Sequence, residues 1–276
     1  MPIPKLHFHI KTMKSIKIKF VTTLALAFTL GLMAFVNIHQ EPKPVLYVIG
    51  DSTVQNSDGN GKNLYWGWGS LLYPYIDTNR IAIRNHAKAG TSTRTFILDG
   101  RWDKILATLK KGDFVIMQFG HNDHAGISDT IQQKGSLLGI SDSTQEIISI
   151  RTHQKELVHT YGWYLQKFIT EAKAKGAFPI VCSLVPRNKW VKGEVVKEAE
   201  YPEWAEAEAK KNGAYYINLN RVIAGHWKEL GADEVKKFFP GDGTHTNLQG
   251  AQFNARCVIE GLKQVTDCPL NEYLKP

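Results

Sequence analysis

The chain has 276 residues and a mass of 31.1 kDa, with 43% hydrophobic and 22% charged residues. These fractions are those of an ordinary globular protein and exclude a disordered or fibrous chain. A chain of this length can bury a sizeable core without disulfide support. The formal net charge of +8 includes five lysines among the first 19 residues, and +3 remains without them. Because this excess is small and no basic stripe is present, we do not expect the protein to bind nucleic acid.

Residues 1–37 are predicted to be an export signal or an N-terminal anchor. Residues 20–36 form an uncharged, mostly apolar run, and lysines lie just before it. A positively charged region followed by an apolar region is typical of a secretory signal. The run is also at the lower limit for a membrane-spanning helix, so an uncleaved anchor stays an alternative. We therefore expect an exported protein, periplasmic or extracellular, that meets a membrane only through such an anchor.

Residues 44–276 are predicted to form one α/β domain. Runs rich in β-branched and aromatic residues predict five strands, at 45–49, 81–87, 114–119, 179–183 and 214–218. Segments with helical character follow at 105–109, 154–175, 201–212 and 248–265. Strands that alternate with helices favour a parallel sheet covered on both faces. Residues 124–151 fit neither period and are expected to form a long insertion of the kind that shapes binding sites.

The three cysteines do not indicate a disulfide framework, and their spacing is not that of a zinc site. Cys182 lies in an apolar run and is expected to be a buried thiol. Cys257 and Cys268 could pair in an exported protein, and their separation leaves this open.

Four polar clusters carry the candidate chemistry. Three of them follow predicted strands, and the fourth precedes the last predicted helix: 50–53 (Gly-Asp-Ser-Thr), 85–92, 120–124 (Gly-His-Asn-Asp-His) and 241–247 (Gly-Asp-Gly-Thr-His-Thr-Asn). Ligands of open parallel sheets bind beyond the carboxyl ends of the strands. We therefore expect the four clusters to meet at one edge of the sheet.

The clusters contain the parts of a serine hydrolase. A serine hydroxyl such as that of Ser52 is a weak nucleophile until a base takes its proton. His245 is the candidate base, and Asp242, three residues earlier, can fix its tautomer. The N–H groups of Ser52 and Gly90 and the side-chain amide of Asn122 are candidate donors to a developing oxyanion. Each cluster alone could be a polar turn or a helix cap, but their joint occurrence favours a catalytic site.

These clusters resemble the four signature blocks of the SGNH (GDSL-type) hydrolases, and the resemblance runs from Val45 to Val265. It implies a flavodoxin-like, three-layer α/β/α fold with a parallel five-stranded sheet. It also implies a triad of Ser52, Asp242 and His245 and an oxyanion hole of Ser52, Gly90 and Asn122. This serine mechanism calls for no metal and no cofactor. Finer motifs, including 67–69 (Gly-Trp-Gly) and 89–94 (Ala-Gly-Thr-Ser-Thr-Arg), resemble the rhamnogalacturonan acetylesterase branch.

The expected substrate is an acetylated pectic polysaccharide or oligosaccharide, with rhamnogalacturonan favoured. This rests on the resemblance and on the predicted export, which would place the enzyme among extracellular polymers. Arginine binds carboxylates bidentately, and aromatic rings stack on sugar faces. The candidate substrate-binding residues, mostly in loops that follow the strands, are Arg94, Arg101, His121 and Trp190.

Several other functions stay open as alternatives. The fold alone does not select among acetylxylan, other carbohydrate esters and lipid esters. A metal-dependent phosphoesterase would use His121, Asp123, His124 and Asp242, but Gly-Asp-Ser lacks the second carboxylate of a bridging two-metal site. A non-catalytic carbohydrate-binding protein is disfavoured because such a protein would not need the triad. A conventional α/β-hydrolase is disfavoured because the sequence has no Gly-x-Ser-x-Gly. The sequence does not predict the oligomeric state.

Overall fold

The computed structural model describes residues 1, 43–55, 64–196 and 200–276, and one compact unit spans Lys43–Pro276. The predicted export signal or anchor falls on residues that, apart from Met1, lie outside the described ones. In the part of the chain that is described, no helix has the length and apolarity needed to cross a membrane.

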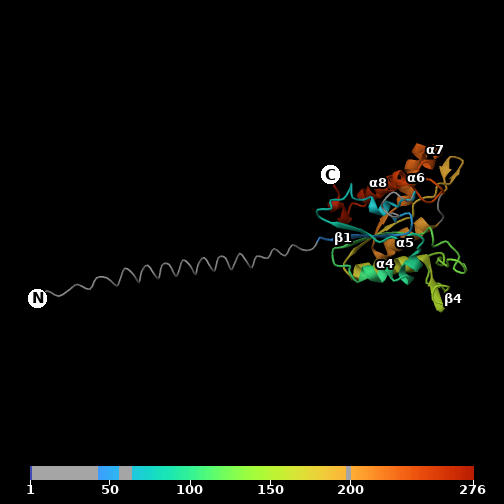
Figure 1. The fold of residues 1–276 in the computed structure, drawn as a ribbon, viewed down its shortest axis with the longest axis horizontal. Helices are drawn as coiled ribbons and strands as arrows, with labels where there is room; N and C mark the ends of the chain where they lie inside the picture. The colour runs from blue at the N-terminus through green and yellow to red at the C-terminus, as the bar shows by residue number, and fades with distance from the viewer. Residues whose placement is uncertain (2–42, 56–63, 197–199) are drawn as a thin grey trace. The chain divides into compact units, whose positions relative to one another are not determined.

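A parallel five-stranded sheet is the centre of the fold (Figure 1). Its strands, in the order β2-β1-β3-β6-β9, are β1 (Val45–Gly50), β2 (Ala82–Asn85), β3 (Phe114–Gln118), β6 (Phe178–Cys182) and β9 (Tyr215–Ile217). All five predicted strands are confirmed, each with ends within two residues of the prediction. Strand β3 is central, with β1 on one side and β6 on the other.

Helices cover both faces of the sheet. Successive strand residues point to opposite faces, so each strand contributes side chains to two cores. Leu46 and Val48 face a core shared with a 3-10 turn at Trp68–Ser70, α6 (Leu219–Leu230) and α8 (Leu248–Gln264). Tyr47 and Ile49 face a second core, and the helices that share it are α2 (Thr93–Leu98), α3 (Arg101–Leu106), α4 (Tyr161–Ala174) and α5 (Tyr201–Asn212). Figure 1 shows α4 on one side of the sheet and α6 and α8 on the other. The predicted three-layer α/β/α architecture is therefore confirmed.

The helices differ from the prediction more than the strands do. Helices α5 and α8 lie where the sequence placed them, whereas α2, α6 and a short α7 (Ala232–Lys236) were not predicted. The helix expected at 105–109 is α3, which begins earlier, at Arg101. The helix expected from residue 154 begins only at Tyr161, because Thr160 caps it: Thr160 Oγ1 accepts the Trp163 N–H at 3.2 Å.

The residues before that cap belong to an antiparallel hairpin of β4 (Thr144–Ile148) and β5 (Lys155–His159). The hairpin begins inside the predicted insertion and extends beyond its predicted end, to His159. It stands out from the body of the domain, as Figure 1 shows. A second, smaller hairpin joins β7 (Trp190–Val191) to β8 (Glu194–Val195).

All three cysteines are buried free thiols, as expected for Cys182. Cys257 and Cys268 are therefore not paired in this structure.

Candidate active site

The four polar clusters meet at the edge of the sheet where the parallel strands end. Ser52 lies in the turn that follows β1, in which the N–H groups of Val54 and Gln55 donate to Asp51 O at 3.2 and 2.9 Å. This turn is tightly enclosed, since a Cβ on Gly67 would lie 2.4 Å from Gln55 O. Only glycine fits where the 64–69 segment passes over the Ser52 turn.

Ser52, His245 and Asp242 form a continuous line of hydrogen bonds. Ser52 Oγ and His245 Nε2 are 2.8 Å apart, although 193 positions separate the residues in the sequence. His245 Nδ1 and Asp242 Oδ2 are 2.7 Å apart. Because a carboxylate only accepts, His245 carries its proton on Nδ1, which leaves Nε2 to accept the Ser52 hydroxyl proton.

The Asp242 carboxylate is held in its ionised form. Burial raises its pKa, but hydrogen bonds from the His245 side chain and from the N–H groups of His245 and Thr244 outweigh this, and the pKa lies below its usual value. Both N–H groups donate to Asp242 Oδ1 at 2.7 Å, so the same carboxylate fixes the loop and orients the imidazole.

A segment near residue 65 supports His245 and was not identified from the sequence. Trp66 N–H donates to Thr246 O at 2.7 Å, and Thr246 Oγ1 donates to Trp66 O at 2.9 Å. This pairing places the Tyr65 ring beside the imidazole, with ring centroids 5.2 Å apart. No local motif marks Tyr65, and only the nearby 67–69 motif could have drawn attention to it.

The three predicted oxyanion donors lie on loops that are joined to one another. Asn122 Nδ2 donates to Thr91 O at 3.0 Å, which connects Asn122 to the residue after Gly90 and leaves its second N–H for another acceptor. Gly90 has a φ of +78°, a conformation that favours glycine. Among the described residues, no acceptor takes the N–H of Ser52 or of Gly90.

A buried chain of hydrogen bonds lies beneath Ser52. Trp68 Nε1 donates to Gln118 Oε1 at 2.9 Å, and Gln118 Nε2 donates to Thr53 Oγ1 at 2.8 Å. Thr53 Oγ1 in turn donates to Asp51 Oδ1 at 2.8 Å. These side chains are all at most 3% exposed, and burial raises the pKa of Asp51 to about 6. Thr53 is thus the link between the Ser52 turn and β3.

Asp123, next to Asn122, points into the protein. Its carboxylate accepts the Thr93 N–H at 3.1 Å, the Thr93 hydroxyl, and the Ser136 hydroxyl at 3.2 Å. Burial raises its pKa to about 7. Asp123 therefore joins the Asn122 loop to the start of α2 and to the insertion.

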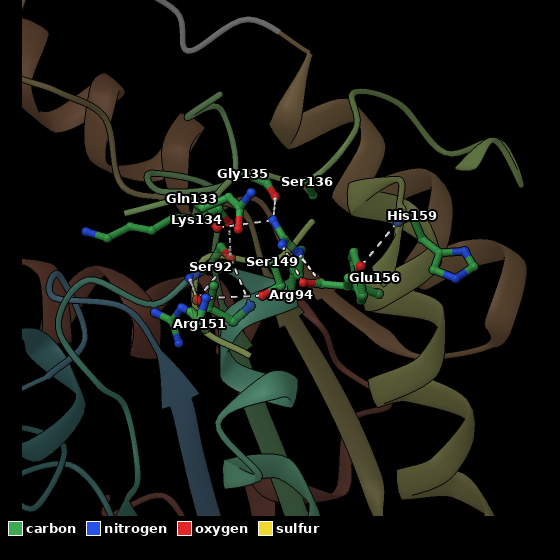
Figure 2. Close-up of polar contacts among 12 residues, drawn as sticks. Ser92, Arg94, Gln133, Lys134, Gly135, Ser136, Ser149, Arg151, Glu156 and His159 are labelled. Atoms are coloured by element: carbon green, nitrogen blue, oxygen red, sulfur yellow. Dashed lines mark hydrogen bonds and ion pairs between the residues drawn. The ribbon is translucent and has the colours of Figure 1, made fainter. Parts of the chain in front are cut away.

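Arg94 does not lie where the sequence analysis placed it. Its side chain has no exposed surface. Its guanidinium pairs with the Glu156 carboxylate and donates hydrogen bonds to the carbonyl oxygens of Gln133 and Gly135 (Figure 2). Since nothing of Arg94 reaches the surface, the prediction that it contacts substrate is wrong. Its role is internal, between α2 and the insertion.

The other candidate substrate-binding residues differ in how they lie relative to the triad. Arg101 lies at the start of α3 with its Nε 3.8 Å from Asp99 Oδ2, and no described contact joins it to the triad. His121 is buried, and burial lowers its pKa to about 3, so its imidazole is neutral. Its substrate-binding role stays a prediction.

Trp190 lies near the triad loop. Its Nε1 donates to Asn188 Oδ1 at 2.7 Å, and Asn188 N–H donates to Gly243 O at 2.7 Å. Arg187, close by, donates to Thr244 Oγ1 at 2.5 Å. The segment that leads into the β7–β8 hairpin therefore adjoins the loop of Asp242 and His245, and a role for Trp190 in substrate binding stays a prediction.

The two carboxylates considered for a metal site, those of Asp123 and Asp242, accept hydrogen bonds from protein groups. Asp242 accepts from His245, and Asp123 accepts from Thr93 and Ser136. Across the described ranges, no three His, Cys, Asp or Glu side chains are grouped so as to hold a metal ion.

Known proteins share both the sequence and the fold. The profile of the GDSL-like lipase/acylhydrolase family matches residues 48–253. A rhamnogalacturonan acetylesterase of Emericella nidulans is 30% identical over 79% of this chain and 84% of its own length. Rhamnogalacturonan acetylesterase RhgT of Bacillus subtilis is 26% identical over 84% of this chain and 95% of its own length.

Solved structures of other proteins share this fold. The crystal structure of YxiM from Bacillus subtilis has a TM-score of 0.66 and 26% identity, and the match covers 82% of this chain but only 58% of YxiM. An acetylxylan esterase of Geobacillus stearothermophilus, at 17% identity, shares the fold with a TM-score of 0.53 over 79% of this chain and 94% of its own. The chain thus belongs to the GDSL-like lipase/acylhydrolase family, the SGNH hydrolases, and is an esterase of that family.

Proposed function

We propose that the protein is an exported serine esterase that removes O-acetyl groups from an extracellular polysaccharide, with rhamnogalacturonan as its substrate. The observation that carries the chemistry is the hydrogen-bonded line from Ser52 Oγ through His245 to Asp242. The proposed oxyanion donors Ser52, Gly90 and Asn122 lie on neighbouring loops.

In this mechanism Ser52 Oγ attacks the acetyl carbonyl carbon while His245 Nε2 takes the hydroxyl proton. The ionised Asp242 stabilises the imidazolium that forms. The N–H groups of Ser52 and Gly90 and the Asn122 amide bind the developing oxyanion. When the tetrahedral intermediate collapses, the bond to the sugar oxygen breaks, and His245 gives its proton to that oxygen.

The acetyl group then remains on Ser52 Oγ as an ester. A water molecule attacks this ester after His245 takes one of its protons, and acetate leaves as the proton returns to Ser52. Each proton that His245 takes is given back in the same half-reaction, so no cofactor is consumed.

The substrate assignment is supported by the relatives that bear the name rhamnogalacturonan acetylesterase, at 26 to 30% identity. Rhamnogalacturonan carries carboxylates along its backbone, whereas xylan is a neutral backbone. An enzyme adapted to the acidic polymer should therefore use electrostatic attraction, which salt screens.

The test compares acetate release from acetylated rhamnogalacturonan and from acetylated xylan at equal acetyl content. We expect faster release from rhamnogalacturonan at low salt and a smaller difference as salt rises. Equal rates on the two polymers at low salt would refute the pectic substrate and leave the serine esterase chemistry standing.

A further inference from the structure

The first part of the insertion is fastened to the loops that carry the proposed oxyanion donors. Ser92 Oγ donates to Lys134 O at 2.6 Å, and Arg94 Nη1 donates to the carbonyls on either side, at 3.1 Å to Gln133 and 2.8 Å to Gly135. Ser136 N–H donates to Asp123 O at 3.0 Å. Residues 133–136 are thus held along their backbone by α2 and by the residue that follows Asn122 (Figure 2).

This anchoring places the Lys134 side chain over Gly90. A Cβ built on Gly90 would lie 3.2 Å from Lys134 Nζ and 3.8 Å from Lys134 Cε. In Figure 2 the Lys134 side chain points away from the pair of Arg94 and Glu156. Because position 90 has no side chain, the ammonium group can lie close to a proposed donor of the oxyanion hole.

The charge of Lys134 is not neutralised by a carboxylate in the described part of the chain, where no acidic oxygen lies within 4.0 Å of Nζ. Lys134 does act on Asp129 electrostatically: the pKa of Asp129 is lowered first by the N–H of Ile131 and, as a smaller cause, by the charge of Lys134. In contrast, Arg94 faces Glu156, and both Arg101 and Arg151 face Asp99.

We propose that Lys134 binds a carboxylate of the substrate next to the acetylated sugar, and that it is the residue that selects acidic over neutral polysaccharides. This inference rests on the proposed function. It assigns to Lys134 the substrate-binding role that the sequence suggested for Arg94. An ammonium offers three donors in directions that a flexible stem can adjust. Such a group suits a carboxylate on a sugar whose orientation varies along a polymer.

The test measures binding of trigalacturonate to the protein by isothermal titration calorimetry, with fully methyl-esterified trigalacturonate as the uncharged probe. We expect the wild type to bind the acid more tightly than its ester. Lys134→Met should weaken binding of the acid about tenfold, the effect of losing a hydrogen bond to a charged group, and leave binding of the ester unchanged. Lys134→Arg, which keeps the charge, should restore most of the affinity for the acid.

Lys155→Met is the matched control, since it removes the same charge at an exposed lysine of β5 that pairs with Glu146. It should bind trigalacturonate like the wild type. Equal affinity of Lys134→Met and wild type, equal losses in Lys134→Met and Lys155→Met, or no preference for the acid in the wild type would overturn the inference. Because binding does not depend on turnover, the two failures are distinguishable. Equal rates on the two polymers would refute the pectic substrate, whereas a retained preference for rhamnogalacturonan with unchanged trigalacturonate binding in Lys134→Met would refute only the role of Lys134.

Discussion

Arg94 and Glu156 are joined by two parallel hydrogen bonds, from Nε to Oε1 at 2.6 Å and from Nη2 to Oε2 at 2.8 Å. Arg94 is fully buried and Glu156 is 13% exposed. The pair joins α2, which follows the Gly90 loop, to β5, which comes just after the insertion. It therefore ties the most irregular segment of the domain to the edge of the sheet where the site lies.

Removing Arg94 should leave a largely buried carboxylate without a partner. We expect Arg94→Met to lower the free energy of unfolding by about 3–5 kcal/mol, as measured by urea denaturation. Arg94→Lys should not restore stability, because lysine cannot make the paired bonds. The more exposed Arg151 pair with Asp99 provides the control, and Arg151→Met should cost about 1 kcal/mol or less. A similar, small loss in both variants would contradict this role for Arg94.

The sheet could be predicted from the sequence because each of its strands is a short apolar run between polar turns. Strand β1, for example, is buried along nearly its whole length and ends at Gly50. The positions of Ser52, Gly90 and Asn122 follow from the same argument, since parallel strands place their carboxyl ends at one edge. Local pattern and topology therefore specify the central part of the candidate site.

The insertion could not be predicted in the same way. Leu157 continues the helical spacing of Tyr161 and Tyr164, yet it lies on β5, because Thr160 ends the strand and caps α4. The sequence suggested that Arg94 is exposed, because no residue near it in the sequence indicates that it pairs with Glu156. Contacts between residues so far apart depend on the path of an irregular loop, which periodicity does not encode.

Loss of Asn122 should affect the transition state more than the fold. Asn122→Ala removes one proposed oxyanion donor, which costs about 2.7–4 kcal/mol of barrier, or about a hundredfold to a thousandfold in kcat. We expect KM and the thermal unfolding midpoint to change little. Asn79→Ala, at an exposed residue before β2, should have normal turnover. Wild-type kcat in Asn122→Ala would exclude Asn122 from the oxyanion hole.

The hydroxyl of Thr53 should be required because it both accepts from Gln118 and donates to Asp51. Thr53→Val keeps the shape but leaves buried partners unsatisfied, and we expect a loss of about 1–3 kcal/mol in the free energy of unfolding. Thr53→Ser should recover most of it. If valine and serine prove equally stable in urea denaturation, the hydrogen-bond chain beneath Ser52 contributes little.

The buried Asp123 should make stability depend on pH. Burial raises its pKa to about 7, well above the usual value of a carboxyl group. The folded protein keeps this proton at pH values where the unfolded chain has lost it. The stabilisation that the neutral carboxyl group provides is therefore complete below about pH 4 and is lost as the pH rises to about 7. Asp123→Asn cannot ionise. Its melting temperature relative to wild type should therefore rise between pH 4.5 and 7.5, and a constant difference would contradict the raised pKa.

The serine mechanism is tested most directly by labelling the nucleophile. The protein is treated with a fluorophosphonate, which reacts with activated serine hydroxyls, and the modified residue is identified by mass spectrometry of its peptides. The account predicts a single adduct on Ser52, loss of esterase activity in proportion to labelling, and no adduct or activity in a folded Ser52→Ala variant. An adduct on another serine, or undiminished activity in Ser52→Ala, would contradict it.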